Sequence, residues 1–332
     1  MQQSKTGIFT NTTASVMHFM TITIFTISTI YAVVENVFLS PSKLHAIFQK
    51  FIKIDEYFAQ IHNSTIVEHK YYILKLILQH VIIFSIIIFN IIWFELLEGN
   101  RIIKISYLQI YAQYHTFVTF LLITNCFAEL RNRFRSTNST LTGIFGGDLN
   151  GSFNMSMKIS KNIEILTMIY GILTEITDLF NDLFGWQILA IFIYTLIGLL
   201  TSLNFIALFV PRCEEIVSDY DINTGFFIVV VLDFTIFAII NNYILAKLAD
   251  SIYEEAKQTS LICYKILQET PSKHILSDEQ EIRGHLSFLA QEATLRSTKI
   301  SAAGFFEVDY TMVFLLFTSV TTYIVVLIQF NM

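Results

Sequence analysis

Residues 304–332 (GFFEVDYTMVFLLFTSVTTYIVVLIQFNM) end the chain, and no charged side chain follows Asp309 in this stretch. As a helix, residues 310–332 would reach about 33 Å, enough to cross a hydrocarbon core that is about 30 Å thick. The sequence therefore predicts that residues 310–330 form a membrane-spanning terminal helix.

This terminal helix also carries polar side chains along one face. Steps of four, four, three and one residues bring the following side chains to the same side of a helix: Thr318, Thr322, Val326, Gln329 and Phe330. An unpaired amide that faces lipid is strongly unfavourable, because no water can satisfy it there. We therefore expect Gln329 to face protein or a water-filled path; a hydrogen bond between neighbouring helices is the alternative interpretation.

The composition of the whole chain is that of a membrane protein. Of 332 residues, 54% are hydrophobic and 14% are charged, whereas soluble domains carry about 25% charged residues. Six segments are long enough to span a bilayer, namely residues 15–38, 72–94, 105–128, 186–210, 225–246 and 310–330. We therefore predict an all-α polytopic membrane protein. The net charge of −6 gives no reason to expect a nucleic-acid partner.

The distribution of positive charge predicts how these spans are oriented. Most of the 21 Lys and Arg residues lie in three loops, which follow the first, third and fifth spans. Loops that are rich in Lys and Arg usually remain in the cytoplasm. We therefore predict a multi-pass protein of the plasma membrane. Its three basic loops should be cytoplasmic, and its carboxyl terminus should be extracellular.

The cytoplasmic segments show helical periodicity of their own. Apolar side chains alternate steps of four and three at Ile165, Ile169, Ile172, Ile176, Leu179 and Leu183. Residues 247–268 extend the fifth span in the same way, Pro271 interrupts the pattern, and a helical pattern resumes over residues 278–299. We predict a packed cytoplasmic helical bundle built from residues 129–185 and 247–309, with a solvated helix hairpin as the alternative.

Four short stretches are similar to motifs of a known family. Thr322-Tyr323, five apolar residues and Gln329-Phe330 resemble the carboxyl-terminal signature of insect gustatory receptors. Further similarity lies at Gly304-Phe305-Phe306, Val308, Asp309, at Arg133-Phe134, Asn138, Leu141, and at Asn181, Phe184-Gly185, Gln187. The similarity covers roughly the last two hundred residues of the chain.

This resemblance implies an architecture and an activity. Members of the family are ligand-gated cation channels that assemble as tetramers, with the last helix of each subunit lining a central pore. The chain would then be a homo- or heterotetrameric channel subunit that detects a small-molecule tastant. Family members have seven helices, and the six spans match helices two to seven, so we expect either a missing first helix or a six-helix variant.

The resemblance also implies roles for residues of the terminal helix. Val326, Gln329 and Phe330 would form rings near the extracellular end of the pore, where apolar rings can close it and an amide ring can contact a passing cation. Thr322 and Tyr323 would hydrogen-bond neighbouring helices and hold the pore helix in place.

Residues on the other spans are candidates for a ligand pocket. Asp233 is the only charged residue well inside a predicted span, and intramembrane carboxylates are often functional. Four further candidates lie on the second and third spans: Asn90, Trp93, Tyr107 and Tyr111. The alternatives are a structural hydrogen bond for Asp233 and interfacial anchoring for the Trp and Tyr side chains.

The sequence favours no other function class. It contains no catalytic motif and no metal-ligand spacing, so we expect neither an enzyme nor a cofactor. A G-protein-coupled type of receptor and a polytopic transporter are the rival interpretations. All three prolines lie outside the predicted spans, and only Gly198 lies well inside one, so the interrupted helices of many transporters are not indicated.

Overall fold

The computed structural model describes most of the chain in six helices and one small hairpin. The described residues are 23, 27, 30, 41–62, 77–81, 84, 85, 88, 103–146, 153–209, 223–269, 277–296 and 298–331. The helices are α2 (Pro41–His62), α4 (Ile103–Gly146), α5 (Phe153–Phe209), α7 (Asn223–Glu269), α8 (Ser277–Leu295) and α9 (Tyr310–Asn331). The strands β1 (Ser301–Ala302) and β2 (Phe306–Glu307) contain two residues each. The prediction of an all-α fold is confirmed.

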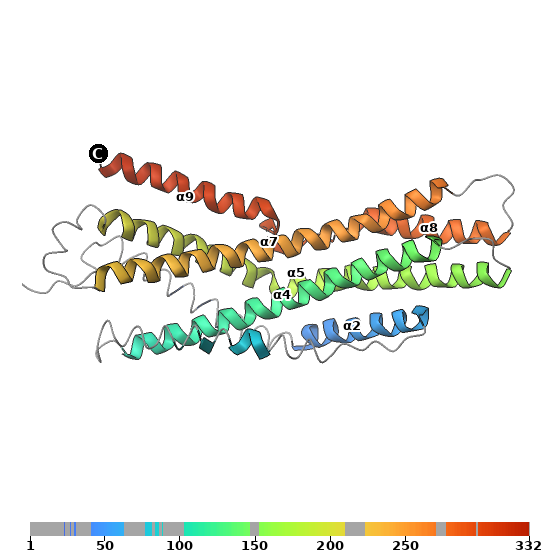
Figure 1. Cartoon of the computed structure of the whole chain (residues 1–332), viewed down its shortest axis with the longest axis horizontal. Coiled ribbons are helices and arrows are strands. Elements are labelled where there is room, and N and C mark those ends of the chain that lie inside the picture. Colours follow the sequence, from blue (N-terminus) through green and yellow to red (C-terminus); the bar gives the residue numbers. More distant parts are fainter. Residues whose placement is uncertain are drawn as a thin grey trace, which may run out of the picture.

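Three long helices form the frame of the elongated molecule (Figure 1). The helices α4, α5 and α7 contain 44, 57 and 47 residues and run side by side along most of the long axis. The helices α2 and α8 cover the right-hand half in this view, and α9 lies along the left-hand half with the carboxyl terminus at that end. Each long helix therefore passes without interruption from the half that contains α9 into the half that contains α2 and α8.

Two described helical stretches are strongly apolar, one on α5 and one on α9. Among the described residues, one helical stretch, Met157–Leu200, is long and apolar enough to cross a membrane, and Tyr310–Val326 is a shorter apolar stretch. The predicted spans 105–128 and 225–246 run through α4 and α7, where many side chains lie outside the described part of the chain. The predicted spans 15–38 and 72–94 lie outside it except at single positions.

The hydrophobic core is organised around α5. The predicted apolar side chains of this helix are buried or half-buried, including Ile169 and Ile176, which have no exposed surface. Aromatic rings fill the space between α4 and α5, where Phe134 meets Tyr170 edge to face with 5.6 Å between the ring centres. Such aromatic pairs stabilise a core beyond the burial of their area.

The helix α2 is not among the elements that the sequence patterns predicted. Its buried face repeats at steps of three and four residues through Leu44, Ile47, Phe51, Ile54 and Phe58. This pattern is typical of an amphipathic helix and could have identified it. On the flank of α2, Lys43 and Lys50 form ion pairs with Asp182 and Glu175 of α5.

The segment between α8 and α9 differs from the prediction. A helix was expected over residues 278–299, but α8 ends at Leu295, and a hairpin of β1 and β2 occupies part of the range assigned to a helical bundle. Farther along, Ala303 and Gly304 both have positive φ, at 52° and 79°, which no α-helix accommodates, so a helical bundle cannot extend unbroken to residue 309. The chain therefore turns sharply before α9 begins.

Candidate functional site: the terminal helix and its linker

The helix α9 begins at a well-formed cap. The side-chain oxygen Oδ1 of Asp309 accepts a hydrogen bond from the backbone N–H of Thr311 at 2.8 Å. A carboxylate in this position satisfies a free N–H group and interacts favourably with the helix dipole. The sequence motif that ends in Asp309 thus marks the start of the terminal helix.

One face of α9 packs against the frame. Met312, Leu316 and Val320 are buried, and Leu316 and Val320 form a small apolar cluster with Leu199 of α5. At the start of the helix, the ring of Tyr310 lies 6.0 Å from that of Tyr243 on α7. The helix is therefore held by α5 and α7 along this face alone, as far as the described residues show.

The opposite face of α9 is uncovered in the single chain. Thr318, Thr322, Val326 and Gln329, four of the five residues predicted to share a face, are all exposed. The hydroxyls of Thr318 and Thr322 donate to the carbonyls of Phe314 and Thr318, one turn earlier in the same helix. The side chain of Phe330 lies outside the described part of the chain.

The predicted supporting residues behave differently from each other. Tyr323 is half-buried, whereas Thr322 is exposed and bonds its own helix. The role that the resemblance implied for Thr322, a hydrogen bond to a neighbouring helix, is not seen among the described residues and stays a prediction.

A two-stranded hairpin links α8 to α9. Its strands pair antiparallel with Ser301 opposite Glu307 and Ala302 opposite Phe306. The N–H of Phe305 donates to the carbonyl of Ala302 at 3.0 Å across the turn. Positive φ at both central residues, Ala303 and Gly304, is the arrangement that type I′ turns require.

The side chain of Asn181 on α5 binds the free edge of β1. Its Nδ2 donates to the carbonyl of Lys299 at 3.0 Å, and its Oδ1 accepts the N–H of Ser301 at 2.9 Å. The amide thus occupies the place of a neighbouring strand, since Lys299, just before β1, and Ser301 present their backbone groups to the same side.

Gly185 lets the hairpin approach α5 closely. A Cβ atom at Gly185 would lie 2.9 Å from the backbone nitrogen of Ala303 and 3.2 Å from its Cα. Two aromatic contacts flank this point, Trp186 with Phe305 and Phe192 with Phe306. Asn181 and Gly185 therefore hold the linker against α5, a contact that the sequence motif did not reveal.

The remaining motif, on α4, joins three other helices. Arg133 binds Asp55 of α2 through two hydrogen bonds, at 3.2 and 2.9 Å, and its guanidinium lies 4.4 Å from the ring centre of Phe51. Phe134 packs on Tyr170 of α5, and Leu141 is fully buried.

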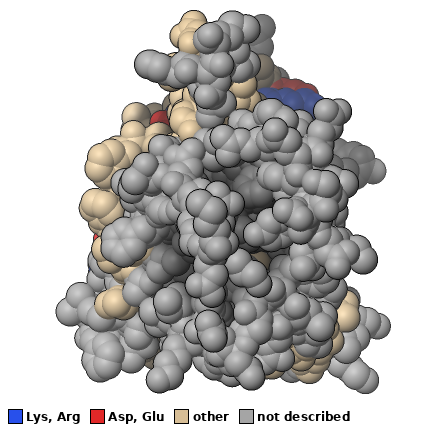
Figure 2. All heavy atoms as spheres, turned by 90° about the vertical axis from the view of Figure 1, so that its left-hand side faces the viewer, with Lys and Arg blue, Asp and Glu red and all other residues tan. Residues whose placement is uncertain are grey.

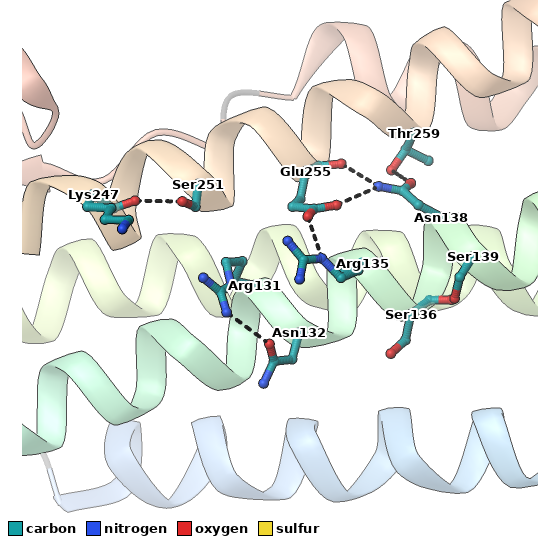
Figure 3. A network of polar contacts seen from close by, with 10 residues as sticks. All are labelled: Arg131, Asn132, Arg135, Ser136, Asn138, Ser139, Lys247, Ser251, Glu255 and Thr259. Carbon is teal, nitrogen blue, oxygen red and sulfur yellow. Dashed lines mark hydrogen bonds and ion pairs between the residues drawn. The ribbon is translucent and has the colours of Figure 1, made fainter. Parts of the chain in front are cut away.

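Asn138 connects α4 with α7 (Figure 3). Its Nδ2 donates to the backbone carbonyl of Glu255 at 2.8 Å, and its Oδ1 accepts the hydroxyl of Thr259 at 2.7 Å. Arg135 adds an ion pair with Glu255 at 2.7 Å. A buried amide whose two ends are both satisfied fixes the register of two helices.

The side chains of the predicted ligand-pocket residues lie outside the described part of the chain. Asn90 and Trp93 lie outside it, and the helix positions of Asp233, Tyr107 and Tyr111 are described without their side chains. Figure 2 shows the left-hand end of the molecule, where most of the visible atoms of described residues are uncharged.

Comparisons with known proteins match this architecture. The chain is similar to the structure of the insect olfactory receptor OR5 from Machilis hrabei, with a TM-score of 0.64 and 13% sequence identity over 97% of this chain and 83% of that chain. For the same receptor in complex with eugenol, the TM-score is 0.63 and the identity 11%, over 97% of this chain and 84% of that chain. At these identities the likeness is one of fold. No curated protein sequence matches the chain.

The sequence itself matches a family over nearly its full length. The family described as 7tm chemosensory receptor matches residues 3–332. Its members are multi-pass membrane receptors and not enzymes. The four motif stretches described above lie within the matched range. This chain therefore belongs to the 7tm chemosensory receptor family.

Proposed function

We propose that this receptor is a subunit of a ligand-gated cation channel in the plasma membrane and that it detects small-molecule tastants. The observation that carries this proposal is the uncovered polar face of α9, where Thr318, Thr322 and Gln329 are exposed on an uncharged, mostly apolar helix. Polar groups in a membrane must meet protein or water. Among the described residues, the hydroxyls of Thr318 and Thr322 bond only their own helix, and the side chain of Gln329 is exposed.

Assembly around an axis satisfies that requirement. In a homo- or heterotetramer, four copies of α9 would meet with these faces inward and would enclose a water-filled path. Gln329 would offer its amide oxygen to a cation, and Val326 would narrow the path with an apolar ring. The similarity in fold to an olfactory receptor that has been seen with eugenol supports a small, largely apolar molecule as the class of ligand.

The proposed orientation places the half that contains α2 and α8 in the cytoplasm and the carboxyl terminus outside. Of the glycosylation sequons, only Asn11 would then be lumenal, and we expect Asn63, Asn138, Asn150 and Asn154 to carry no glycan. Mobility shifts after glycosidase treatment of receptor from animal cells measure this.

Asn138 cannot report the orientation of a folded receptor, because it is buried against α7. A glycan at Asn150 or Asn154 would contradict the proposed orientation, whereas an unmodified Asn11 would be neutral, since that site lies close to a predicted span.

Calcium imaging of cells that express the receptor, against a panel of small-molecule tastants, tests the channel proposal directly. Within this experiment, Asp233→Asn tests the predicted ligand contact, because the substitution keeps the shape of the side chain and removes its charge. We expect the concentration for a half-maximal calcium response to change about tenfold, as for the loss of a charged hydrogen bond.

The surface amount of the Asp233→Asn receptor serves as the control and should stay near that of the wild type. A reduced surface amount with an unchanged half-maximal concentration would assign Asp233 to structure rather than to ligand binding. A wild-type receptor that reaches the surface and binds a panel compound without any calcium entry would exclude the channel proposal.

A further inference from the structure

Among the described residues, the linker between α8 and α9 connects the helical bundle to the terminal helix. The bundle can therefore position α9 through it. Its backbone is tied on both sides: β2 pairs with one edge of β1, and Asn181 of α5 binds the other edge. Below the linker, Arg296 donates to the hydroxyl of Thr174, also on α5, at 2.9 Å. Successive points of the segment that leads to α9 are therefore fixed to a single helix.

The close approach at Gly185 makes this attachment specific. A Cβ atom on residue 185 would lie only 2.9 Å from the backbone nitrogen of Ala303. Real Cβ atoms essentially never come this close to another heavy atom. The atoms concerned belong to the backbone, so no side chain can rotate away to relieve the overlap. By contrast, a Cβ atom added at Gly171 on the same helix would meet nothing within 4 Å.

Hydrogen-bonded residues connect the hairpin directly to the start of α9. The N–H of Val308 donates to the carbonyl of Ile300 at 2.8 Å, Asp309 caps the helix, and Tyr310 is its first residue. A displacement of the hairpin on α5 is therefore passed to the start of α9, because only a few hydrogen-bonded residues separate them.

We propose that Asn181 and Gly185 are positioning residues for the terminal helix: they lock the 299–304 segment onto α5 and thereby relay movement between the helical bundle and α9. This inference rests on the proposed function, since it assigns to the bundle the control of the helix that we propose to line the pore. The lock consists of two amide hydrogen bonds and one backbone contact.

A distance measurement on the full receptor tests the lock without any ligand or current. Spin labels are attached at Gln258→Cys on α7 and Thr321→Cys on α9, both at exposed positions. Cys213 is replaced by serine. Cys126 and Cys263 are buried, and burial raises the pKa of the Cys263 thiol to about 12, so labelling at that site is slow. Labelled chains are diluted with unlabelled ones, so that the measured pairs lie within one chain.

We expect Gly185→Ala to shift or broaden the distribution of distances between the two labels by several ångströms. The matched control, Gly171→Ala, adds the same methyl group to the same helix in open space and should leave the distribution unchanged. Asn181→Asp, which keeps the acceptor for Ser301 but loses the donor to Lys299, should give a smaller shift and keeps the test decisive if Gly185→Ala fails to fold. If a folded Gly185→Ala or Asn181→Asp receptor gives the same distribution of distances as Gly171→Ala, the proposed lock is wrong.

A second readout separates the relay from a purely structural role. At equal surface amounts, cells that express Gly185→Ala should differ at least twofold in resting calcium from cells that express Gly171→Ala. Shifted distances with equal resting calcium would overturn the relay. Failure of the channel proposal is recognised separately, by the absence of calcium entry through the wild-type receptor in the tastant panel, and it leaves the distance result intact.

Discussion

Replacing Arg133 by leucine should remove most of the receptor from the cell surface. The side chain of Arg133 is 16% exposed and binds two carboxylates, Asp55 at 2.9 Å and Glu129 at 2.7 Å. Without the guanidinium, these carboxylates face each other across α2 and α4, and Phe51 loses the planar group that covers its ring. Because both carboxylates retain partial access to water, we expect a loss of about 2 kcal/mol, between the values for exposed and fully buried pairs.

Arg135 provides the matched control for this substitution. It lies on the same helix, its side chain is 62% exposed, and it forms an ion pair with Glu255 alone among the described residues. Arg135→Leu should therefore lower the thermal midpoint of the purified receptor by much less than Arg133→Leu does. Arg133→Lys should fall between them, since an ammonium keeps the charge but not the forked geometry. Equal midpoints and equal surface labelling for the two leucine variants would show that Arg133 does not clamp α2.

Replacing Gln329 by alanine should change permeation several-fold while leaving ligand sensitivity nearly intact. In the proposed assembly, four amide oxygens line the path near its extracellular end, and their loss removes partial negative charge from the route of the cation. The readouts are the single-channel conductance and the shift of reversal potential when sodium is exchanged for a larger cation. The concentration for a half-maximal response should stay close to that of the wild type.

Leu327→Ala serves as the control on the same turn. In the sequence, Leu327 lies off the face shared by Thr322, Val326 and Gln329, so its truncation should alter packing or expression instead of permeation. If neither substitution changes permeation in a receptor that demonstrably opens, α9 does not line the pore.

The sequence predicted best those features that rest on a long, regular pattern. The buried seam of α5 and the apolar run of α9 extend over several turns, and no proline interrupts them, so their helical state follows from periodicity. The apolar residues of α2 also recur at steps of three and four, so the same reasoning could have predicted this helix. Its charged residues, however, made the segment resemble a loop.

Contacts between residues that are far apart in the sequence could not be predicted from periodicity. Arg133 and Asp55 are 78 positions apart, and Asn181 and Ser301 are 120 apart, so only the folded chain shows that these polar side chains are partners. The hairpin has strands of two residues each, too short for any alternation to be recognised. The predicted ligand-pocket residues stay predictions, because their side chains fall outside the described part of the chain.

The amide that binds the edge of β1 also has a consequence for biogenesis. An unpaired strand edge is a template on which another nascent chain can add its own backbone, which is a common start of aggregation. Synthesis proceeds from the amino terminus, so α5, with Asn181, leaves the ribosome before the hairpin does. When β1 emerges, the side chain that closes its edge is therefore already present in the same molecule.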